Sequence, residues 1–537
     1  MPTFDPCLGP DGHGPYRLMR WVNGGLVRRF LRDLEDPEAA TRRRFAQILK
    51  GMRGTAFIAE SGCHAVRTLE EFRSAIPVRS HAELKPWLDR VASGEGRVLT
   101  RQRPSMLLET SGTTGAPKHL PVTKAWAQRT QYAQRLWTLG LIRDHESLTT
   151  GKALTMVSPA VHGRSEGGLP IGSNTGRIRA AQPGWLKSRY VVPEDVSQIQ
   201  DPVVRQYVSL VFACSADVRS ITTANPSLLL LLFRRMKEWS NEIREDVASG
   251  HLSSGPARGL DPVLRDRLSS KLEAAPLPDT LDPTQLWDLA SVNCWTNGPA
   301  AYFAERLQSV LPGIDIRELG VTASEGTFAV PLRSDWPGSV LWTGGPVMEF
   351  LFDDGRLKWP WELEEGDRAR LVITTSAGLV RYDMADELEV VGRCKGTPMV
   401  RFVGKAGRYL NRVGERVTAG QVSSAMRSLS INAAGFTVFA EAGDIPFYVI
   451  GIEGENISPG LAEAFDSALS AHNIEYASKR RSGRLGPPVL QRLEAGHYAR
   501  FRARRVAQGA PEGQLKDPIL AVDRREWHMV LDTEQAR

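Results

Sequence analysis

Cysteine is scarce in this sequence. The chain has five cysteines in 537 residues, and no two of them form a Cys-x-x-Cys pair. Zinc ribbons and thioredoxin-like redox sites need such pairs, so both classes are excluded. The five are odd in number and far apart, which suits a reducing compartment better than a disulfide framework. We therefore expect a cytoplasmic protein.

Long apolar runs are missing as well. The longest, Leu228–Phe233, falls far short of the about 20 residues that a membrane helix needs. The N-terminal stretch has neither the basic nor the apolar region of a signal peptide. The charge excess is small, +7 from 68 Lys and Arg against 61 Asp and Glu, and its densest basic cluster is residues 500–505. We expect no membrane and no nucleic-acid partner, and the oligomeric state stays open.

The composition, 42% apolar and 24% charged, is that of a globular protein, and the length allows two to four domains. Apolar periodicity predicts helices over 17–50, 227–247 and 461–469. Short apolar runs predict strands at 106–108, 153–158, 314–318, 340–342, 371–374, 436–441 and 447–453, and the Gly-rich stretch 163–184 reads as a long loop. We predict an α/β fold. A large N-terminal α/β domain spans residues 1–405, and a hinge joins it to a small α+β domain over 406–537.

The strongest local pattern lies at residues 110–118, which read Thr-Ser-Gly-Thr-Thr-Gly-Ala-Pro-Lys. It follows a predicted strand and precedes a helix for which Thr123 is the expected N-cap. Glycines let backbone N–H groups approach an anion, hydroxyls add donors, and the lysine adds a positive charge. The Gly-Lys-Ser/Thr ending of a Walker A loop is absent. The pattern predicts a loop that binds phosphates.

Further motifs follow in order: Asn-Cys-Trp-Thr at 293–296, Ala-Ser-Glu-Gly at 323–326, Gly-Leu-Val-Arg-Tyr-Asp-Met-Ala-Asp at 378–386 and Gly-Ala-Pro-Glu-Gly-Gln-Leu-Lys at 509–516. Together with the phosphate loop they resemble the Gretchen Hagen (auxin-responsive) family of acyl acid–amido synthetases, within the adenylate-forming superfamily. The resemblance extends over nearly the whole chain. It implies a large adenylate-forming domain and a small mobile C-terminal domain.

The resemblance also implies a ligase activity that explains these residue types. A carboxylic acid does not acylate an amine at neutral pH, because hydroxide is a poor leaving group. Enzymes of this family convert the acid to an acyl-AMP with ATP and Mg²⁺, release pyrophosphate, and pass the acyl group to an amine, here expected to be an amino acid. The protein must bind the phosphates and neutralise the charge that builds on them.

The family pattern assigns roles to particular positions. Phosphate binding falls to Ser111, Gly112, Thr113, Thr114, Gly115 and Lys118. Glu325 is implied as a Mg²⁺ ligand and Lys516 as a partner of the developing charge, while the remaining nucleotide contacts fall to Thr296, Val321, Thr322, Ser324, Asp386 and Lys405. Substrate contacts are expected from His119, His162 and Phe233.

Three residues in or next to these positions differ from the family pattern. Val321 stands where the family has an aromatic residue that stacks on adenine, so stacking is lost. Ala385 replaces a glycine before Asp386. Lys405 replaces an arginine, so the planar guanidinium that could make two parallel hydrogen bonds to a ribose or a phosphate is absent. A catalytically impaired nucleotide-binding homologue therefore stays open as an alternative, and so does an acyl-CoA ligase with coenzyme A as acceptor.

Some residues also have a different interpretation. Glu325 fits a helix N-terminus, Asp386 fits a solvated acidic face, and Lys516 fits an exposed tail. The run Gly-Arg-Ser-Glu-Gly at 163–167 matches the nucleophile elbow of serine hydrolases. The glycines and proline that follow it disfavour the helix that an elbow requires.

Overall fold

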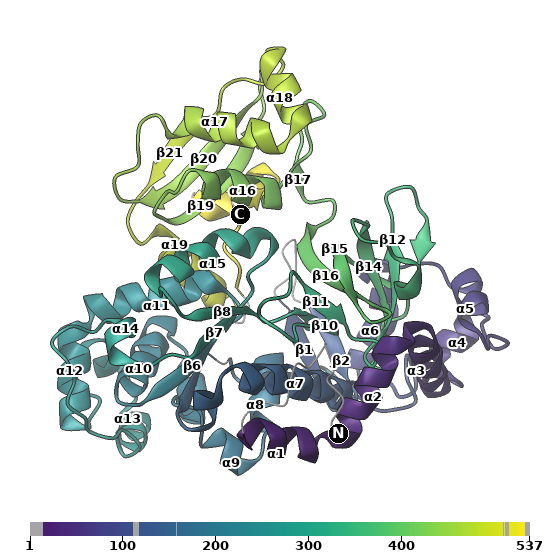
Figure 1. Ribbon diagram of the computed structural model, residues 1–537, viewed down its shortest axis with the longest axis horizontal. Coiled ribbons are helices and arrows are strands. Elements are labelled where there is room, and N and C mark those ends of the chain that lie inside the picture. The colour runs from purple at the N-terminus through teal and green to yellow at the C-terminus, as the bar shows by residue number, and fades with distance from the viewer. Residues whose placement is uncertain (1–13, 111–117, 157, 509, 511–514, 532–537) are drawn as a thin grey trace. The chain divides into compact units, whose positions relative to one another are not determined.

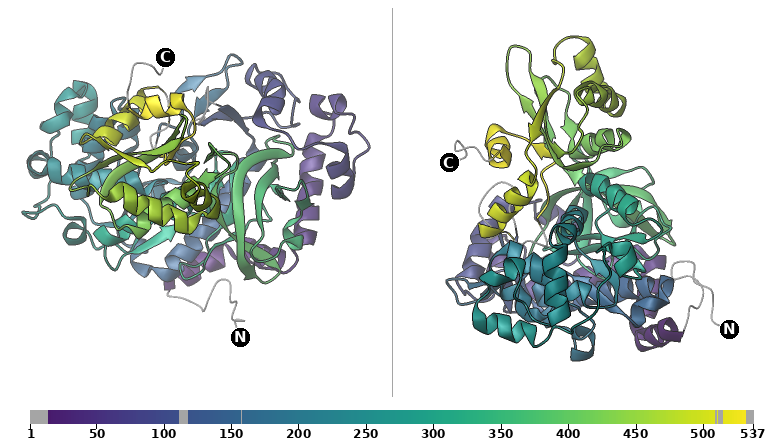
Figure 2. Two further views of the ribbon diagram at one scale, coloured as in Figure 1. Left: turned by 90° about the horizontal axis from the view of Figure 1, so that it is seen from above. Right: turned by 90° about the vertical axis from the view of Figure 1, so that its left-hand side faces the viewer.

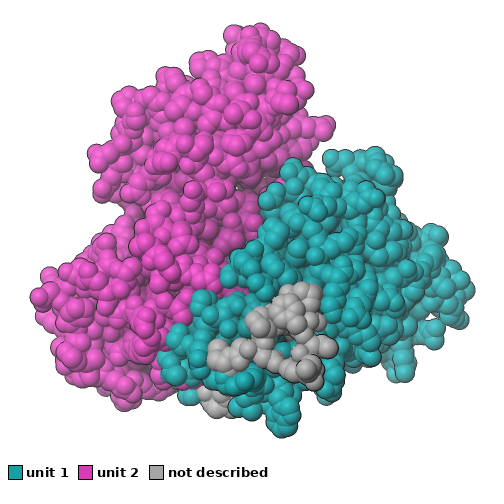
Figure 3. All heavy atoms as spheres, in the orientation of Figure 1, with its two compact units in different colours: residues 1–151, 157–188, 318–402 teal, residues 152–156, 189–317, 403–537 magenta. Residues whose placement is uncertain are grey.

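The computed structural model describes residues 14–110, 118–156, 158–508, 510 and 515–531 (Figure 1). The chain forms two compact units, each assembled from three separate segments (Figure 3). Unit 1 comprises Met1–Gly151, Val157–Ser188 and Glu318–Phe402, and unit 2 comprises Lys152–Met156, Arg189–Arg317 and Val403–Arg537. The mixed α/β class predicted from the sequence is confirmed, whereas the domain boundary at 405–406 stays a prediction.

Unit 1 begins with helices, as the periodicity over 17–50 predicts. They are α1 (Gly14–Val22), α2 (Gly24–Glu35) and α3 (Pro37–Met52), followed by α4 (Ala56–Glu60), α5 (Leu69–Ala75) and α6 (His81–Ala92). The break before α3 has a local cause: the Asp36 side chain accepts the backbone N–H of Ala39 at 2.8 Å, and Pro37 occupies the first helical turn.

A four-stranded sheet of unit 1 has the order β2-β1-β5-β4. Its strands are β1 (Met106–Thr110), β2 (Lys118–Val122), β4 (Gly163–Arg164) and β5 (Pro170–Gly172). β1 runs antiparallel to β2 and parallel to β5. The helix α7 (Lys124–Asp144) then begins where predicted, because the Thr123 side chain accepts the backbone N–H of Trp126 at 3.2 Å.

The long loop predicted over 163–184 is wrong. That stretch contains β4, β5 and the helices α8 (Asn174–Ala180) and α9 (Gly184–Lys187). Its glycines serve close packing: a Cβ on Gly172 would lie 1.8 Å from the carbonyl oxygen of Ala160, and one on Gly176 would lie 2.5 Å from the backbone of the same segment. The sequence shows the glycines, but it does not show the backbone that they face.

The second sheet of unit 1 has eight strands in the order β13-β12-β14-β15-β16-β11-β10-β9. Their bounds are β9 (Val321–Ala323), β10 (Gly326–Val330), β11 (Ser339–Leu341), β12 (Val347–Leu351), β13 (Leu357–Lys358), β14 (Arg368–Thr374), β15 (Tyr382–Cys394) and β16 (Thr397–Lys405). The strands predicted near 340–342 and 371–374 are confirmed. Alternate residues of β15 are buried, as a sheet packed on one face requires.

Unit 2 contains a sheet of order β3-β6-β7-β8, made of β3 (Lys152–Thr155), β6 (Val218–Thr222), β7 (Ser291–Cys294) and β8 (Asp315–Glu318). β3, β6 and β7 are parallel. The connecting helices are α10 (Pro202–Cys214), α11 (Pro226–Glu238), α12 (Ser240–Ser249), α13 (Pro262–Ser269), α14 (Pro283–Leu286) and α15 (Ala301–Val310). The single helix predicted over 227–247 is thus two helices, which meet at Trp239.

The C-terminal part of unit 2 is a sheet of order β21-β20-β19-β22 with helices on both faces (Figures 1 and 2). Its strands are β19 (Ala433–Glu441), β20 (Phe447–Gly454), β21 (Val489–Leu493) and β22 (Leu520–Ala521), and a short ribbon, β17 (Tyr409–Leu410) with β18 (Val417–Thr418), precedes them. α16 (Ala419–Ser428) and α17 (Leu461–His472) share one apolar core with β19 and β20. α18 (Ile474–Arg481), α19 (His497–Ala507) and α20 (Arg524–Leu531) complete the unit. In the part of the chain that is described, no helix is both long and apolar enough to span a membrane.

Candidate functional site

The predicted phosphate loop connects two strands, β1 and β2, which pair with each other at its ends. Thr110, the last residue of β1, lies directly opposite Lys118, the first residue of β2. The loop therefore enters a strand, and the helix that was expected to follow it begins only after β2, at Lys124. The residues between, with the predicted phosphate contacts Ser111, Gly112, Thr113, Thr114 and Gly115, lie outside the described residues.

Lys118 meets a second motif of unit 1 in space. Its Nζ lies 3.5 Å from the Oη of Tyr382, a residue 264 positions away that opens β15. Tyr382 is 3% exposed. This tyrosine lies within the 378–386 motif, but the motif alone predicts no role for it. Its contact with Lys118 depends on how β15 is placed against the β1–β2 hairpin, which no local pattern reveals.

Glu325 lies at the tight turn between β9 and β10. Its carbonyl oxygen accepts the indole N–H of Trp126 at 2.8 Å, which ties this turn to α7. The interpretation of Glu325 as a residue at a helix N-terminus is therefore wrong. Ser324 lies in the same turn and Thr322 in β9, both half-buried, and Val321 is buried at the start of β9.

Asp386 owes its placement to an irregularity in β15. Arg370 of β14 pairs with Glu387, but Val372, two residues further on, pairs with Asp383, so β15 carries extra residues at this point. Bulges of this kind change the direction of side chains. Asp386 is 7% exposed, so its interpretation as part of a solvated acidic face is wrong.

The Tyr382 hydroxyl stands among the charged groups of three motifs. Burial raises its pKa far above the ordinary value for tyrosine, and the negative charges of Glu325, Asp386 and Asp383 raise it further. The phenol therefore stays protonated, with the ammonium of Lys118 beside it. One cation and three carboxylates, drawn from three motifs, thus act on one buried hydroxyl, an arrangement suited to a polyanion that carries hydroxyl groups and a divalent cation.

The two predicted histidines meet on another carboxylate. His119 of β2 lies opposite Glu109 of β1, with 3.5 Å between its Nε2 and one carboxylate oxygen. His162, just before β4, places its Nε2 3.5 Å from the other oxygen. The hydrogen bond from His119 lowers the pKa of Glu109, and the charge of His162 adds to this, although burial opposes it. Sequence reasoning missed Glu109, because an acidic residue at the end of a strand carries no signal of its own.

In unit 2, Lys516 is held over an aromatic ring. Its Nζ lies 4.4 Å from the centre of the Trp295 ring, and Trp295 directly precedes the predicted nucleotide contact Thr296. Both neighbours of Lys516 are anchored: the carbonyl of Leu515 accepts a hydrogen bond from Asn225 at 2.7 Å, and the carboxylate of Asp517 pairs with Arg502. Lys516 is exposed, yet its backbone is fixed on both sides, so it does not belong to a loose tail.

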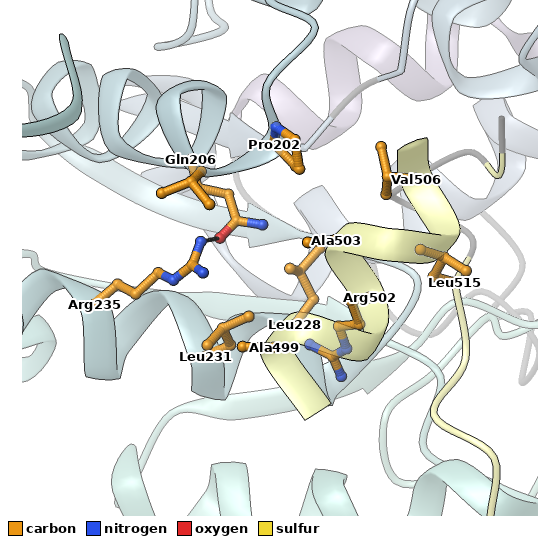
Figure 4. A pocket seen from close by; sticks show the side chains of 11 residues that line it. Pro202, Gln206, Leu228, Leu231, Arg235, Ala499, Arg502, Ala503, Val506 and Leu515 are labelled. Carbon is orange, nitrogen blue, oxygen red and sulfur yellow. Dashed lines mark hydrogen bonds between the residues drawn. The ribbon is translucent and has the colours of Figure 1, made fainter. Parts of the chain in front are cut away.

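Two other predicted residues of unit 2 have contrasting surroundings. Phe233 of α11 is 4% exposed and packs against Trp287, with the ring centres 6.5 Å apart. Lys405, at the end of β16, is exposed. A pocket between α10, α11 and α19 lies beside Arg502 and Leu515 (Figure 4). Its enclosed volume of about 10 Å³ holds about one water molecule and no substrate.

Residues 163–167 do not form the nucleophile elbow of a hydrolase. Gly163 and Arg164 form β4, and residues 165–169 make a turn in which the Ser165 hydroxyl accepts the backbone N–H of Leu169 at 3.2 Å. A Cβ on Gly167 would lie 2.3 Å from the backbone nitrogen of Gly94, so this glycine permits a close crossing of two segments. The serine thus stabilises a turn between two strands instead of opening a helix.

The α/β scaffold has the fold of solved adenylate-forming enzymes. The chain belongs to the GH3 family: the model of the GH3 family N-terminal domain matches residues 26–316, that of the central domain residues 353–405, and that of the C-terminal domain residues 418–525. The resemblance seen in the sequence is confirmed.

Individual proteins agree with this assignment. Indole-3-acetic acid-amido synthetase GH3.10 of Arabidopsis thaliana is 24% identical over 551 residues, covering 90% of this chain and 91% of its own. The solved structure of the GH3.15 acyl acid amido synthetase has a TM-score of 0.82 and 18% identity over 94% of this chain and 95% of its own. A 2-hydroxyisobutyryl-CoA ligase bound to 2-HIB-AMP has a TM-score of 0.52 and 13% identity over 93% of this chain and 92% of its own. The last two matches establish the fold.

Proposed function

We propose that this chain is an ATP-dependent acyl acid–amido synthetase. It activates a small carboxylic acid as acyl-AMP with release of pyrophosphate, then transfers the acyl group to an amine, which we expect to be an amino acid. The observation that carries the proposal is the contact of Lys118 with the buried Tyr382 hydroxyl, on which the charges of Glu325 and Asp386 also act. These groups come from three separate motifs of a GH3-family chain.

The residues take complementary parts in this reaction. Lys118 neutralises negative charge on the departing pyrophosphate, together with the loop residues Ser111–Gly115. Asp386 accepts hydrogen bonds from the ribose hydroxyls. Ser324 and Thr296 contact the nucleotide near the α-phosphate, and Lys516 stabilises charge during adenylation. Further contacts in this proposal come from Val321, Thr322 and Lys405 to the nucleotide, and from Phe233 to the substrate.

Magnesium fits this set of residues as a companion of the nucleotide. Mg²⁺ in nucleotide sites is commonly held by one or two carboxylates together with substrate phosphates. Among the described residues no three His, Cys, Asp or Glu side chains form a metal site by themselves. Glu325, half-buried at its turn, supplies one carboxylate, and a bound Mg²⁺ would neutralise charge on the phosphates.

The proposal also covers the cellular compartment and the domain organisation of the enzyme. We place it in the cytoplasm, because its scattered cysteines suit a reducing compartment. We also propose that residues 1–405 and 406–537 form two functional domains, with Lys516 in the second.

An acid library tests the reaction. The enzyme is incubated with ATP, Mg²⁺ and single carboxylic acids, and pyrophosphate release is measured. We expect release that depends on a particular acid. Products formed with that acid are then identified by mass spectrometry in the presence of a panel of amino acids, and in parallel with coenzyme A.

Each outcome selects one reaction. An amide product supports the proposal, and a thioester formed in its place would make the protein an acyl-CoA ligase. ATP binding by calorimetry without pyrophosphate release for any acid would indicate the impaired homologue that Val321 and Lys405 left open.

A further inference from the structure

Three consecutive arginines of α3 differ in their partners. Arg42 is exposed and pairs with Glu70 at 2.7 Å. Arg43 is exposed too, and it pairs with Asp33 at 2.7 Å. Arg44 is only 6% exposed, and among the residues that the structure describes no carboxylate pairs with its guanidinium. The innermost positive charge of the three is therefore the one without a counter-charge in the described chain.

Arg44 has neutral partners instead, and it shares one of them with Arg129 of α7. Its Nε donates to the carbonyl oxygen of Gly345 at 2.5 Å, and its Nη1 donates to the Oε1 of Gln47 at 3.2 Å. The Nη2 of Arg129 donates to the same oxygen of Gln47 at 3.1 Å. Two guanidinium groups thus converge on one uncharged oxygen. Because a guanidinium has five N–H donors, both groups keep donors for a further acceptor beyond these bonds.

A third guanidinium, that of the exposed Arg29 on α2, adds to this positive charge. Burial, together with the positive charges of Arg129 and Arg29, lowers the pKa of Arg44 to about 9. Burial and the charge of Arg29 lower the pKa of Arg129 as well. The carboxylate of Asp33 offsets only part of this effect, and it already pairs with Arg43. A buried cation without a counter-charge is costly, so a bound anion would stabilise this group.

We propose that Arg29, Arg44 and Arg129 form a binding site for a phosphate group, carried by inorganic phosphate or by a phosphate ester. A planar guanidinium can donate two parallel hydrogen bonds to phosphate, and three such groups suit an anion with two negative charges and several acceptor oxygens. A carboxylate has one charge and two oxygens, and it would neutralise the group less completely. Arg44 is buried, Arg129 is half-buried and Arg29 is exposed, so the site has a covered base and an open side.

A structural role for Arg44 explains only part of this arrangement. Its bond to Gly345 ties α3 to the turn between β11 and β12, and one arginine suffices for that. The tie does not explain why Arg129 directs its guanidinium to the same oxygen of Gln47, or why Arg29 adds a further positive charge. None of the three arginines is among the residues expected to bind the nucleotide, so the inference does not depend on the proposed function.

Thermal unfolding of the full-length protein in increasing inorganic phosphate tests the site, with the ionic strength held constant by chloride. A ligand of the folded state raises the unfolding temperature, and the shift gives its dissociation constant. Lys118→Ala serves as the parent protein, because it removes the charge expected to bind phosphate at the catalytic site. In this parent, Arg129→Gln is expected to raise the dissociation constant about ten-fold or more, since it removes a charge-assisted hydrogen bond. Arg42→Gln, on α3 with Glu70 as its partner, is the control and is expected to leave the constant unchanged.

Each shift is measured against the same variant without phosphate, so a change in the stability of a variant does not imitate a change in binding. The inference is overturned if the Lys118→Ala parent shows no shift with phosphate, or an equal shift with acetate. It is also overturned if Arg129→Gln leaves the dissociation constant unchanged, or if Arg42→Gln raises it as much. Glycerol 3-phosphate distinguishes the two sources of the phosphate group. A shift with this ester supports a site for phosphate esters, and a shift with inorganic phosphate alone supports a site for the free ion.

Discussion

Two lysines that the sequence assigns to one reaction occupy contrasting surroundings. Lys118, in unit 1, lies beside a buried phenol on which three acidic side chains also act. In unit 2, the Lys516 ammonium lies over the ring of Trp295, and the backbone of Lys516 is fixed through its neighbours Leu515 and Asp517.

The contrast separates two ways to place a charge. Around Lys118, the Tyr382 hydroxyl and the carboxylates that act on it come from distant motifs. Removing the Lys118 ammonium therefore removes the positive charge from a group of interacting side chains. Around Lys516, the backbone is anchored and the side chain extends over an apolar ring, so the anchors matter as much as the charge. Four changes test this comparison, in decreasing order of expected effect.

The largest effect is expected from Lys118→Ala. Loss of one charge that stabilises a developing anion costs about 100-fold to 1,000-fold in rate, so acid-dependent pyrophosphate release falls by that factor. Lys85→Ala is the control, because Lys85 forms an exposed pair with Asp89 on α6. A Lys118→Ala enzyme with unchanged release would remove the phosphate loop from the mechanism.

The second change attacks the anchor of Lys516. Asp517 is 1% exposed at its side chain and pairs with Arg502, which also donates to the Ser227 hydroxyl. Asp517→Ala leaves a buried guanidinium without its carboxylate, which costs about 3 kcal/mol. Hydrogen exchange measured by mass spectrometry is expected to accelerate in residues 515–521 and at the start of α11. Asp266→Ala, at an exposed pair, serves as control, and equal exchange in the two variants would show that the anchor is dispensable.

These two sites also differ in what the sequence could predict. The loop sequence at 110–118, the Thr123 cap and the strands of the large sheet follow local rules, and the structure confirms the cap and the strands. The contacts Lys118–Tyr382 and Lys516–Trp295 join residues more than 200 positions apart and depend on strand order. The bulge in β15 and the close packing of Gly172 likewise arise from the opposing backbone, which no local pattern encodes.

The third change concerns the other face of the Lys118 hairpin. The hydrogen bond from His119 and the charge of His162 lower the pKa of Glu109. A carboxyl group whose pKa is lower in the folded state adds stability above its unfolded pKa, here 4.5, and this stability is lost as the pH falls through the folded value. Glu109→Gln is expected to unfold more easily by about 1 kcal/mol near pH 7, and the difference from the unmodified protein shrinks below about pH 4.

Urea unfolding at a series of pH values measures this difference. Glu166→Gln, at an exposed position near His162, is expected to change the unfolding free energy little at any pH. A Glu109→Gln difference that persists unchanged into acid would mean that the carboxylate charge contributes nothing and that the loss comes from packing.

The smallest effect is expected at Ala385, beside Asp386. Ala385 has φ 53°, in the left-handed region, which costs a residue with a Cβ about 1–2 kcal/mol. Glycine removes this cost but loses about 0.5–1 kcal/mol through the greater freedom of the unfolded chain. The first effect exceeds the second, so Ala385→Gly is expected to stabilise the protein by up to about 1 kcal/mol. The hydrogen bond from the Ala385 backbone N–H to Asp383 at 2.8 Å is retained, because it needs no side chain.

Thermal unfolding of the Ala385→Gly and Ala82→Gly variants measures whether each substitution raises or lowers the stability of the protein. Ala82 is exposed in α6, where glycine brings the entropic cost without any relief, so that variant is expected to lose about 1 kcal/mol. If both variants lose stability equally, the bulge in β15 does not strain Ala385, and the placement of Asp386 needs another cause. If only Ala385→Gly gains stability, the left-handed backbone beside Asp386 is strained by the Cβ, and this chain keeps alanine there at a cost in stability.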